Sequence, residues 1–215
     1  MRHADTVRSL VRRSPLLYDV VEPPHSRIIA ARWQRQGAPI PAPGAVKRNM
    51  LRLTAQHHHL RVLIETGTYT GDTVMALHRH FDRIVSVELS HELHAKAVRQ
   101  ARHRRNVELL LGDSAEVLPR VLATLHQPAL FWLDAHYSGG VTALGETISP
   151  ISSELDAILA HDVKKHVILV DDAREFHDSA RSGYPGAEVV AAAASRHNYA
   201  MSEEHDVFFL LPNRQ

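Results

Sequence analysis

The sequence of 215 residues contains no cysteine, which excludes disulfide bonds, a thiolate nucleophile and cysteine zinc sites. It also lacks a charge excess: 25 basic and 24 acidic residues leave a formal net charge of +1, which does not favour a nucleic-acid partner. No apolar run approaches the ~20 residues of a membrane span, and the arginine-rich N-terminus lacks the continuous apolar segment of a secretory signal. We therefore expect a cytoplasmic protein without nucleic-acid or membrane partners; an arginine-rich transit peptide is the alternative.

Proline and glycine are concentrated in one stretch, GAPIPAPG at residues 37–44, which predicts a stiff, non-helical linker. Residues 1–44 are therefore predicted to form an N-terminal extension that ends in this linker. Residues 45–215 are long enough for one domain with a full core. The extension can pack within the chain or across a homodimer.

Three helices are expected before the regular part of the chain begins. The first covers residues 10–21 and is stopped by Pro23 and Pro24, and the second covers 28–36. The third covers 45–58, with an apolar side that we expect to pack at the edge of a sheet.

From residue 61 onward, apolar runs alternate with helical segments. The apolar runs cover 62–64, 84–87, 107–111, 129–133 and 166–170. The helical segments cover 71–80, 90–104, 114–125, 147–161 and 186–196. Alternation of this kind predicts an α/β fold with a parallel sheet covered on both faces. The last residues read as two strands with a tight turn near 203–206, so we predict a Rossmann-like, seven-stranded, mostly parallel sheet with a C-terminal antiparallel hairpin.

The first strand leads into a glycine loop, RVLIETGTYTGDTV at residues 61–74. Gly67 and Gly71 allow a sharp turn and the close approach of a ligand to the backbone. The helix that follows offers free N–H groups, which suit an anionic group. The alternative is an ordinary turn in which the glycines serve geometry alone.

Each of the five apolar runs is followed by an acidic residue, and the last by a pair. These residues are Glu65, Glu88, Asp113, Asp134, Asp171 and its neighbour Asp172. In a parallel sheet they all lie at the carboxyl edge, where open α/β folds bind ligands. A helix cap explains one or two of them, but like charges on one edge repel unless cations or hydrogen-bond donors meet them.

Glu88 lies at the end of the second strand, where an acid binds the ribose hydroxyls of a nucleoside cofactor. Nicotinamide cofactors also use such an acid. However, the loop reads GxxxG and not GxGxxG, which supports a pyrophosphate site less well.

The motifs ETGTYTGDT, VSVELS and LLGDS together resemble those of the class I methyltransferases, which use S-adenosylmethionine. The resemblance spans about residues 60–211. It implies that one set of residues binds the cofactor: Glu65, Thr66, Gly67, Thr68, Tyr69, Gly71, Asp72, Thr73, Glu88, Asp113, Ser114 and Asp134.

Within that class the sequence is most similar to the divalent-metal-dependent O-methyltransferases of the catechol, caffeoyl-CoA and macrolide-sugar types. This resemblance implies that Asp134, Asp171 and Asp172 hold a divalent cation. Three carboxylates form a hard oxygen site that suits Mg²⁺. The catechol type has a lysine base three positions after the first metal ligand, whereas this chain has Tyr137 there. We therefore predict His136 or Tyr137 as the catalytic residue, since a histidine can accept a hydroxyl proton.

The resulting prediction is an S-adenosylmethionine-dependent methyltransferase that methylates a small hydroxylated acceptor with the help of a divalent ion. Two alternatives stay open. One is an NAD(P)-dependent oxidoreductase on the same kind of sheet. The other is a non-catalytic protein that binds S-adenosylmethionine, which the missing lysine would fit.

Overall fold

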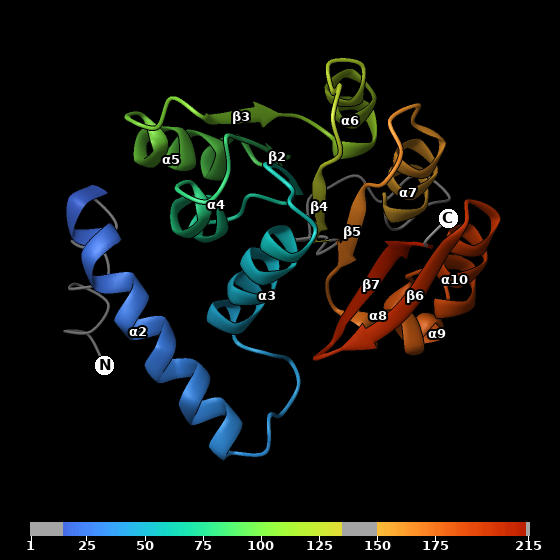
Figure 1. Ribbon diagram of the computed structural model, residues 1–215, viewed down its shortest axis with the longest axis horizontal. Coiled ribbons are helices and arrows are strands. Elements are labelled where there is room, and N and C mark those ends of the chain that lie inside the picture. The colour runs from blue at the N-terminus through green and yellow to red at the C-terminus, as the bar shows by residue number, and fades with distance from the viewer. Residues whose placement is uncertain (1–14, 135–149, 214–215) are drawn as a thin grey trace.

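The computed structural model describes residues 15–134 and 150–213. It contains a seven-stranded sheet in the order β3-β2-β1-β4-β5-β7-β6 (Figure 1). The strands are β1 Val62–Thr66, β2 Arg83–Glu88, β3 Val107–Leu111, β4 Leu130–Leu133, β5 Val167–Val170, β6 Tyr199–Glu204 and β7 Val207–Pro212. The helices are α2 Pro15–Arg35, α3 Gly44–His57, α4 Asp72–Leu77, α5 His91–Ala101, α6 Ser114–Leu122, α7 Ile151–Ala160, α8 Ala173–His177, α9 Ser179–Ser182 and α10 Ala187–Arg196.

Strands β1 to β5 pair in parallel, and β7 pairs antiparallel with both β5 and β6. The reversal of strand order between β1 and β4 creates the point at which open α/β sheets bind ligands. The predicted fold class, the parallel strands and the closing hairpin are all confirmed.

Helices cover both faces of the central strands, as the continuous apolar runs predicted. Residues of α6, α7 and α10, such as Leu118, Ile158 and Val190, pack against one face. Residues of α3 and α4, such as Leu51 and Val74, pack against the other. The edge strand β3 is only partly covered, because it has a neighbour on one side alone.

The N-terminal segment corrects one expectation. Pro23 and Pro24 do not stop a helix, because α2 runs continuously from Pro15 to Arg35. Proline removes a backbone donor and so weakens a helix, but its fixed φ is close to the helical value, and the chain continues through both residues. The predicted end of the second helix is correct, since Gly37 follows with a φ of 83°.

The end of α2 and the linker pack onto the domain. Trp33 is buried with Ala42 and Val46, and its Nε1 donates to the carbonyl of Pro39 at 2.7 Å. Its ring also meets His205 edge-on, with centroids 4.8 Å apart. This cluster fixes α3 at the start of the domain; the division of domains at residue 44 stays a prediction.

None of the helices in the described part of the chain has the length and apolar character needed to cross a membrane.

Candidate active site

The five strand-terminal acids lie at the carboxyl edge of the parallel strands, as predicted. Glu65 belongs to the end of β1 and Glu88 is the last residue of β2. Asp113 follows β3, Asp134 follows β4, and Asp171 follows β5. Because β1, β4 and β5 are neighbours, three of these acids lie near the centre of the sheet.

The loop after β1 brings the backbone close to β4. Gly67 and Gly71 have φ values of 91° and 77°, which side chains rarely adopt. A Cβ atom on Gly67 would lie 2.9 Å from the carbonyl oxygen of Asp134, so this position requires glycine. Beside the loop lies a cavity of about 280 Å³. It is lined by Gly67, Thr68, Tyr69, Thr70, Asp72, Thr73 and Asp134.

Glu65 lies beneath this loop, fully buried. Its Oε2 accepts a hydrogen bond from the hydroxyl of Ser86 at 2.5 Å, and Ser86 also contacts the hydroxyl of Thr68 at 2.6 Å. Burial raises the pKa of Glu65 to about 8, and the hydrogen bonds from Ser86 and Thr73 only partly oppose it. Glu65 therefore supports the loop from below.

Glu88 holds the loop from the side. Its carboxylate accepts hydrogen bonds from the backbone N–H groups of Tyr69 at 2.7 Å and Ser90 at 2.9 Å. Tyr69 itself has a φ of 48° and an exposed side chain beside the cavity. The carboxylate thus contacts the backbone of a residue that lines the cavity, and its predicted role toward a ribose stays a prediction.

Asp113 acts as a helix cap: its side chain accepts the N–H of Ala115 at 2.8 Å. Ser114 begins α6 and hydrogen-bonds Glu154, a buried acid of α7 that also accepts from the hydroxyl of Thr66 at 3.4 Å. Burial raises the pKa of Glu154 to about 7. The sequence analysis missed Glu154, because an acid within an amphipathic helix is usually solvated.

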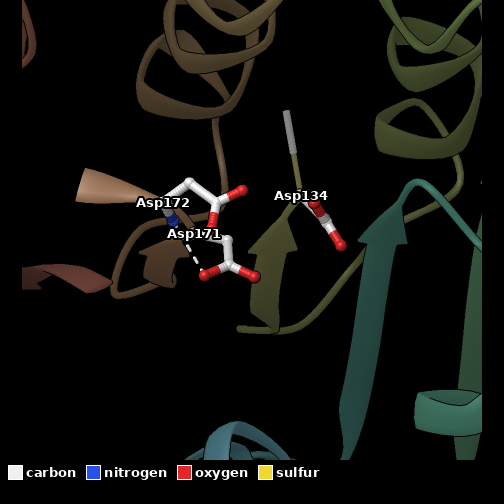
Figure 2. Close-up of side chains that lie close together, drawn as sticks. All are labelled: Asp134, Asp171 and Asp172. Atoms are coloured by element: carbon white, nitrogen blue, oxygen red, sulfur yellow. Dashed lines mark hydrogen bonds between the residues drawn. The ribbon is translucent and has the colours of Figure 1, made fainter. Parts of the chain in front are cut away.

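Asp134, Asp171 and Asp172 converge, as predicted from the adjacency of β4 and β5. Each offers a carboxylate oxygen, and these oxygens all lie within 4.8 Å of one another (Figure 2). Asp172 has a φ of 57°, and the carboxylate of Asp171 accepts its backbone N–H at 2.7 Å. Burial, together with the Asp172 carboxylate, raises the pKa of Asp171.

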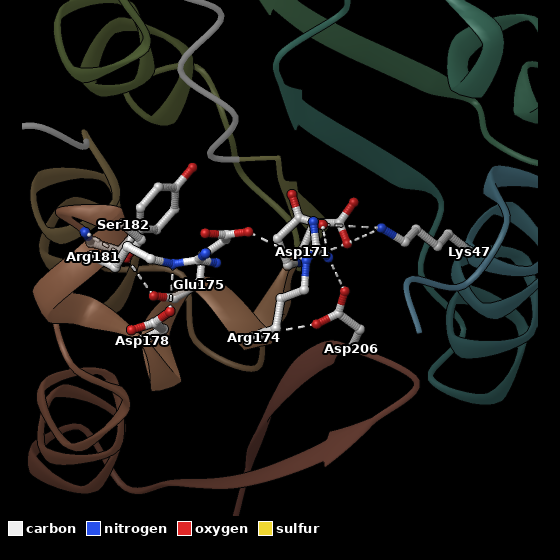
Figure 3. Close-up of polar contacts among 10 residues, drawn as sticks. Lys47, Asp171, Arg174, Glu175, Asp178, Arg181, Ser182 and Asp206 are labelled. Carbon is white, nitrogen blue, oxygen red and sulfur yellow. Dashed lines mark hydrogen bonds and ion pairs between the residues drawn. The ribbon is translucent and has the colours of Figure 1, made fainter. Parts of the chain in front are cut away.

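Two cationic side chains meet these acids (Figure 3). The ammonium of Lys47, on α3, lies 2.5 Å from Oδ1 of Asp171 and 3.4 Å from Oδ1 of Asp172. Burial alone would lower the pKa of Lys47, but the carboxylates outweigh it and raise that pKa. On the other side, Arg174 lies 2.8 Å from Asp172 and also pairs with Asp206.

Asp206 anchors this arrangement from the hairpin turn between β6 and β7. It is buried, and it accepts the backbone N–H of Arg174 at 2.8 Å as well as pairing with its guanidinium. Sequence reasoning missed both Lys47 and Asp206, since each is far from the acids along the chain. The position of Arg174 just after the acid pair is visible in the sequence, but its pairing with Asp206 is not.

A second cavity, of about 240 Å³, contains the acid cluster. It is lined by Ala42, Gly44, Lys47, Arg48, Leu51, Thr73, Trp132, Asp134, Asp171 and Asp172. Thr73 and Asp134 line both cavities, so the two share a wall. The predicted catalytic residues His136 and Tyr137 lie outside the described residues.

The three carboxylates fit a divalent cation in ligand type and spacing. Hard ions such as Mg²⁺ are bound by a few carboxylates together with water and substrate oxygens. Two of these carboxylates, Asp171 and Asp172, also pair with Lys47, so the cluster is already partly neutralised by the chain itself.

Comparison with solved structures shows a shared fold. An O-methyltransferase from Bacillus cereus in complex with SAH has 15% identity, covers 91% of this chain and 95% of its own, and gives a TM-score of 0.59. The O-methyltransferase TomG from Streptomyces achromogenes, in complex with SAM, has 16% identity, coverage of 87% and 89%, and a TM-score of 0.54. The N-methyltransferase NodS from Bradyrhizobium japonicum WM9 has 14% identity, coverage of 78% and 95%, and a TM-score of 0.54.

No curated protein matches the sequence. A family profile described as "Methyltransferase domain" does match, over residues 64–173, which is just over half of the chain. The matched segment begins in β1, contains the glycine loop, and ends after the acid pair that follows β5. The chain therefore belongs to the methyltransferase domain family.

Proposed function

We propose that the protein transfers a methyl group from S-adenosylmethionine to a hydroxyl oxygen of a small acceptor, with a divalent ion at the acid cluster. The observation that carries this proposal is the pair of cavities that share Thr73 and Asp134. Methyl transfer is an in-line displacement, so donor and acceptor must lie side by side. The cavity beside the glycine loop suits the donor, and the cavity with the acid cluster suits the acceptor.

S-adenosylmethionine as the donor is supported by the cofactor loop. Gly67 and Gly71 let the backbone approach a ligand, and Glu88 lies at the end of β2 against the backbone of Tyr69, at the position where an acid pairs with ribose hydroxyls. Asp134 on the shared wall offers negative charge near a positive sulfonium. Structural relatives with SAH and SAM bound agree with this assignment.

The fold itself does not separate oxygen from nitrogen acceptors, because relatives of both kinds share it. The acid cluster favours an acceptor that is methylated on oxygen. A divalent ion, when bound, lowers the pKa of a hydroxyl and orients it. Asp134, Asp171 and Asp172 would hold this ion, and Arg174 and Asp206 fix the position of Asp172.

The test has two arms. Calorimetry with S-adenosylmethionine and with NAD measures the donor: binding of NAD with no binding of S-adenosylmethionine would contradict the proposal. Transfer of a labelled methyl group to a panel of small hydroxylated and amino acceptors then measures the reaction, before and after chelation and Mg²⁺ add-back. Binding of the donor without transfer to any acceptor would favour the non-catalytic alternative. The homodimer and the cytoplasmic location remain predictions.

A further inference from the structure

We propose that the ammonium of Lys47 and the divalent ion are alternative occupants of the same carboxylate cluster, so that the ion binds only when Lys47 withdraws. This inference deepens the proposed function and rests on it. The exchange of the Lys47 ammonium for the ion would set the affinity of the cluster for that ion.

The ammonium of Lys47 is placed among the carboxylates. Its nitrogen lies 2.5 Å from Asp171 and 3.4 Å from Asp172, and its charge also acts on Asp134. It therefore interacts with all three members of the cluster that would bind the ion.

The distance between the ammonium and an ion bound to Asp171 would be short. An ion such as Mg²⁺ lies ~2.1 Å from each carboxylate oxygen that binds it. If Oδ1 of Asp171 held the ion while Lys47 stayed in place, the two cations would be at most ~4.6 Å apart, the sum of that bond length and the observed 2.5 Å. Like charges this close, in a buried site, repel strongly. For an ion held by this oxygen, the two cations therefore exclude each other.

The side chain of Lys47 has room to move away from the acids. Lys47 reaches the acids from α3, and its side chain also lines the cavity of about 240 Å³ that contains them. A lysine ammonium sits on a flexible four-carbon stem, so it can leave the acids without movement of the helix. Arg174 is different, because Asp206 holds it from the hairpin turn. Of these two cations, Lys47 is the one that can give way.

The direct test compares Mn²⁺ binding, in protein stripped by chelation, between the unchanged chain and Lys47→Met. The matched control is Lys165→Met, which removes an exposed charge just before β5, at the other edge of the sheet. We expect Lys47→Met to bind Mn²⁺ on the order of 10- to 100-fold more tightly, because both competition and repulsion are removed. Lys165→Met should match the unchanged chain. Equal or weaker binding by Lys47→Met overturns the inference.

A second measurement follows Lys47 itself. Reductive methylation with labelled formaldehyde, read by mass spectrometry, reports how accessible each lysine is. The side chain of Lys47 is 13% exposed in its ion pair, so labelling without an ion should be slow. Saturating Mg²⁺ should raise labelling of Lys47 several-fold and leave Lys164 and Lys165 unchanged. Labelling of Lys47 that does not respond to Mg²⁺ overturns the inference.

Failure of the inference and failure of the proposed function give different results. If the unchanged chain and Lys47→Met bind Mn²⁺ equally, only the exchange is wrong. If neither binds Mn²⁺, the ion is absent from the function as well, while calorimetry with S-adenosylmethionine still tests the donor. Thermal melting of Lys47→Met, and of Lys47→Gln as a second variant, shows that both are folded before either result is interpreted.

Discussion

The ammonium of Lys47 lies 2.5 Å from a carboxylate oxygen of Asp171, although 124 residues separate them along the chain. The contact joins a helix that precedes the sheet to the end of the fifth strand. It means that the acids at the centre of the carboxyl edge are partly neutralised by the chain itself. It also means that the site is completed by a segment outside the matched family region, residues 64–173.

Replacing Glu88 by glutamine should weaken the binding of S-adenosylmethionine by about 1–3 kcal/mol. The amide keeps the size of the side chain but removes the charge that accepts from Tyr69 and Ser90 and would accept from the ribose. Calorimetry measures the effect. The control is Glu108→Gln on β3, whose exposed acid pairs with Arg83. Unchanged affinity in Glu88→Gln would remove Glu88 from the cofactor site.

Replacing Asp171 by asparagine should reduce the binding of Mg²⁺ or Mn²⁺ and lower the rate of methyl transfer, while binding of S-adenosylmethionine is retained. The reason is that Asp171 lines the cavity of the acid cluster and not the cavity of the glycine loop. We expect a loss of tenfold or more in ion affinity, on the order of the ~1.4 kcal/mol that corresponds to tenfold. Asp162→Asn, an exposed acid before β5, is the control. Equal loss of donor binding would show that the two cavities do not act separately.

The stability of the protein should fall as the pH rises from 5 to 8, in part through Glu65. Burial raises the pKa of Glu65 from 4.5 to about 8 in the folded chain, so its stabilising contribution is complete below pH 4.5 and is lost as the pH rises through 8. Glu65→Gln cannot ionise and should lose about 1–4 kcal/mol less over this range. Urea unfolding of both proteins at pH 5 and pH 8 checks this. If the free energy of unfolding changed equally with pH in both proteins, folding would not raise the pKa of Glu65.

His166 should act in the opposite direction. Its Nδ1 accepts the N–H of Ala129 at 3.1 Å, so its proton lies on Nε2, which is 3.0 Å from Nδ1 of His161. Burial, assisted by His161, lowers the pKa of His166 to about 4. Its contribution is therefore complete above pH 6.5 and is lost as the pH falls through 4.

The variant His166→Asn tests this, because its Oδ1 can accept the same N–H of Ala129 and the side chain does not titrate. Between pH 7 and pH 4.5, the unchanged protein should lose about 1–3 kcal/mol more stability than the variant. Urea unfolding at the two pH values is the measurement, with exposed His126→Asn as the control. If His126→Asn gave the same difference, the effect would belong to histidines in general.

The fold was predictable from the sequence because its signals are local. A short, β-branched apolar run such as 166–170, which alternates with helical segments, predicts a buried strand, and the acid after it then falls at the carboxyl edge. The convergence of Asp134 and Asp171 followed from the expected adjacency of β4 and β5. The turn of the C-terminal hairpin was also predictable from neighbouring residues alone.

What the sequence did not reveal depends on contacts between distant segments. Lys47 lies on a helix whose position is fixed by packing of Leu51 and its neighbours, and no spacing rule connects it to Asp171. Asp206 reads as an ordinary turn residue, although its side chain is buried against Arg174. Pro23 and Pro24 show the reverse case, in which a strong local rule was overridden within α2.

The wall shared by the two cavities has a consequence for inhibitors. Thr73 and Asp134 border both spaces, so a molecule in one cavity lies only the thickness of these side chains from a molecule in the other. A compound that joins an adenosine-like part to a hydroxylated ring through a short linker would span the wall and occupy both cavities. Its second part would bind as if at very high local concentration, so two weak fragments would combine into one tight ligand.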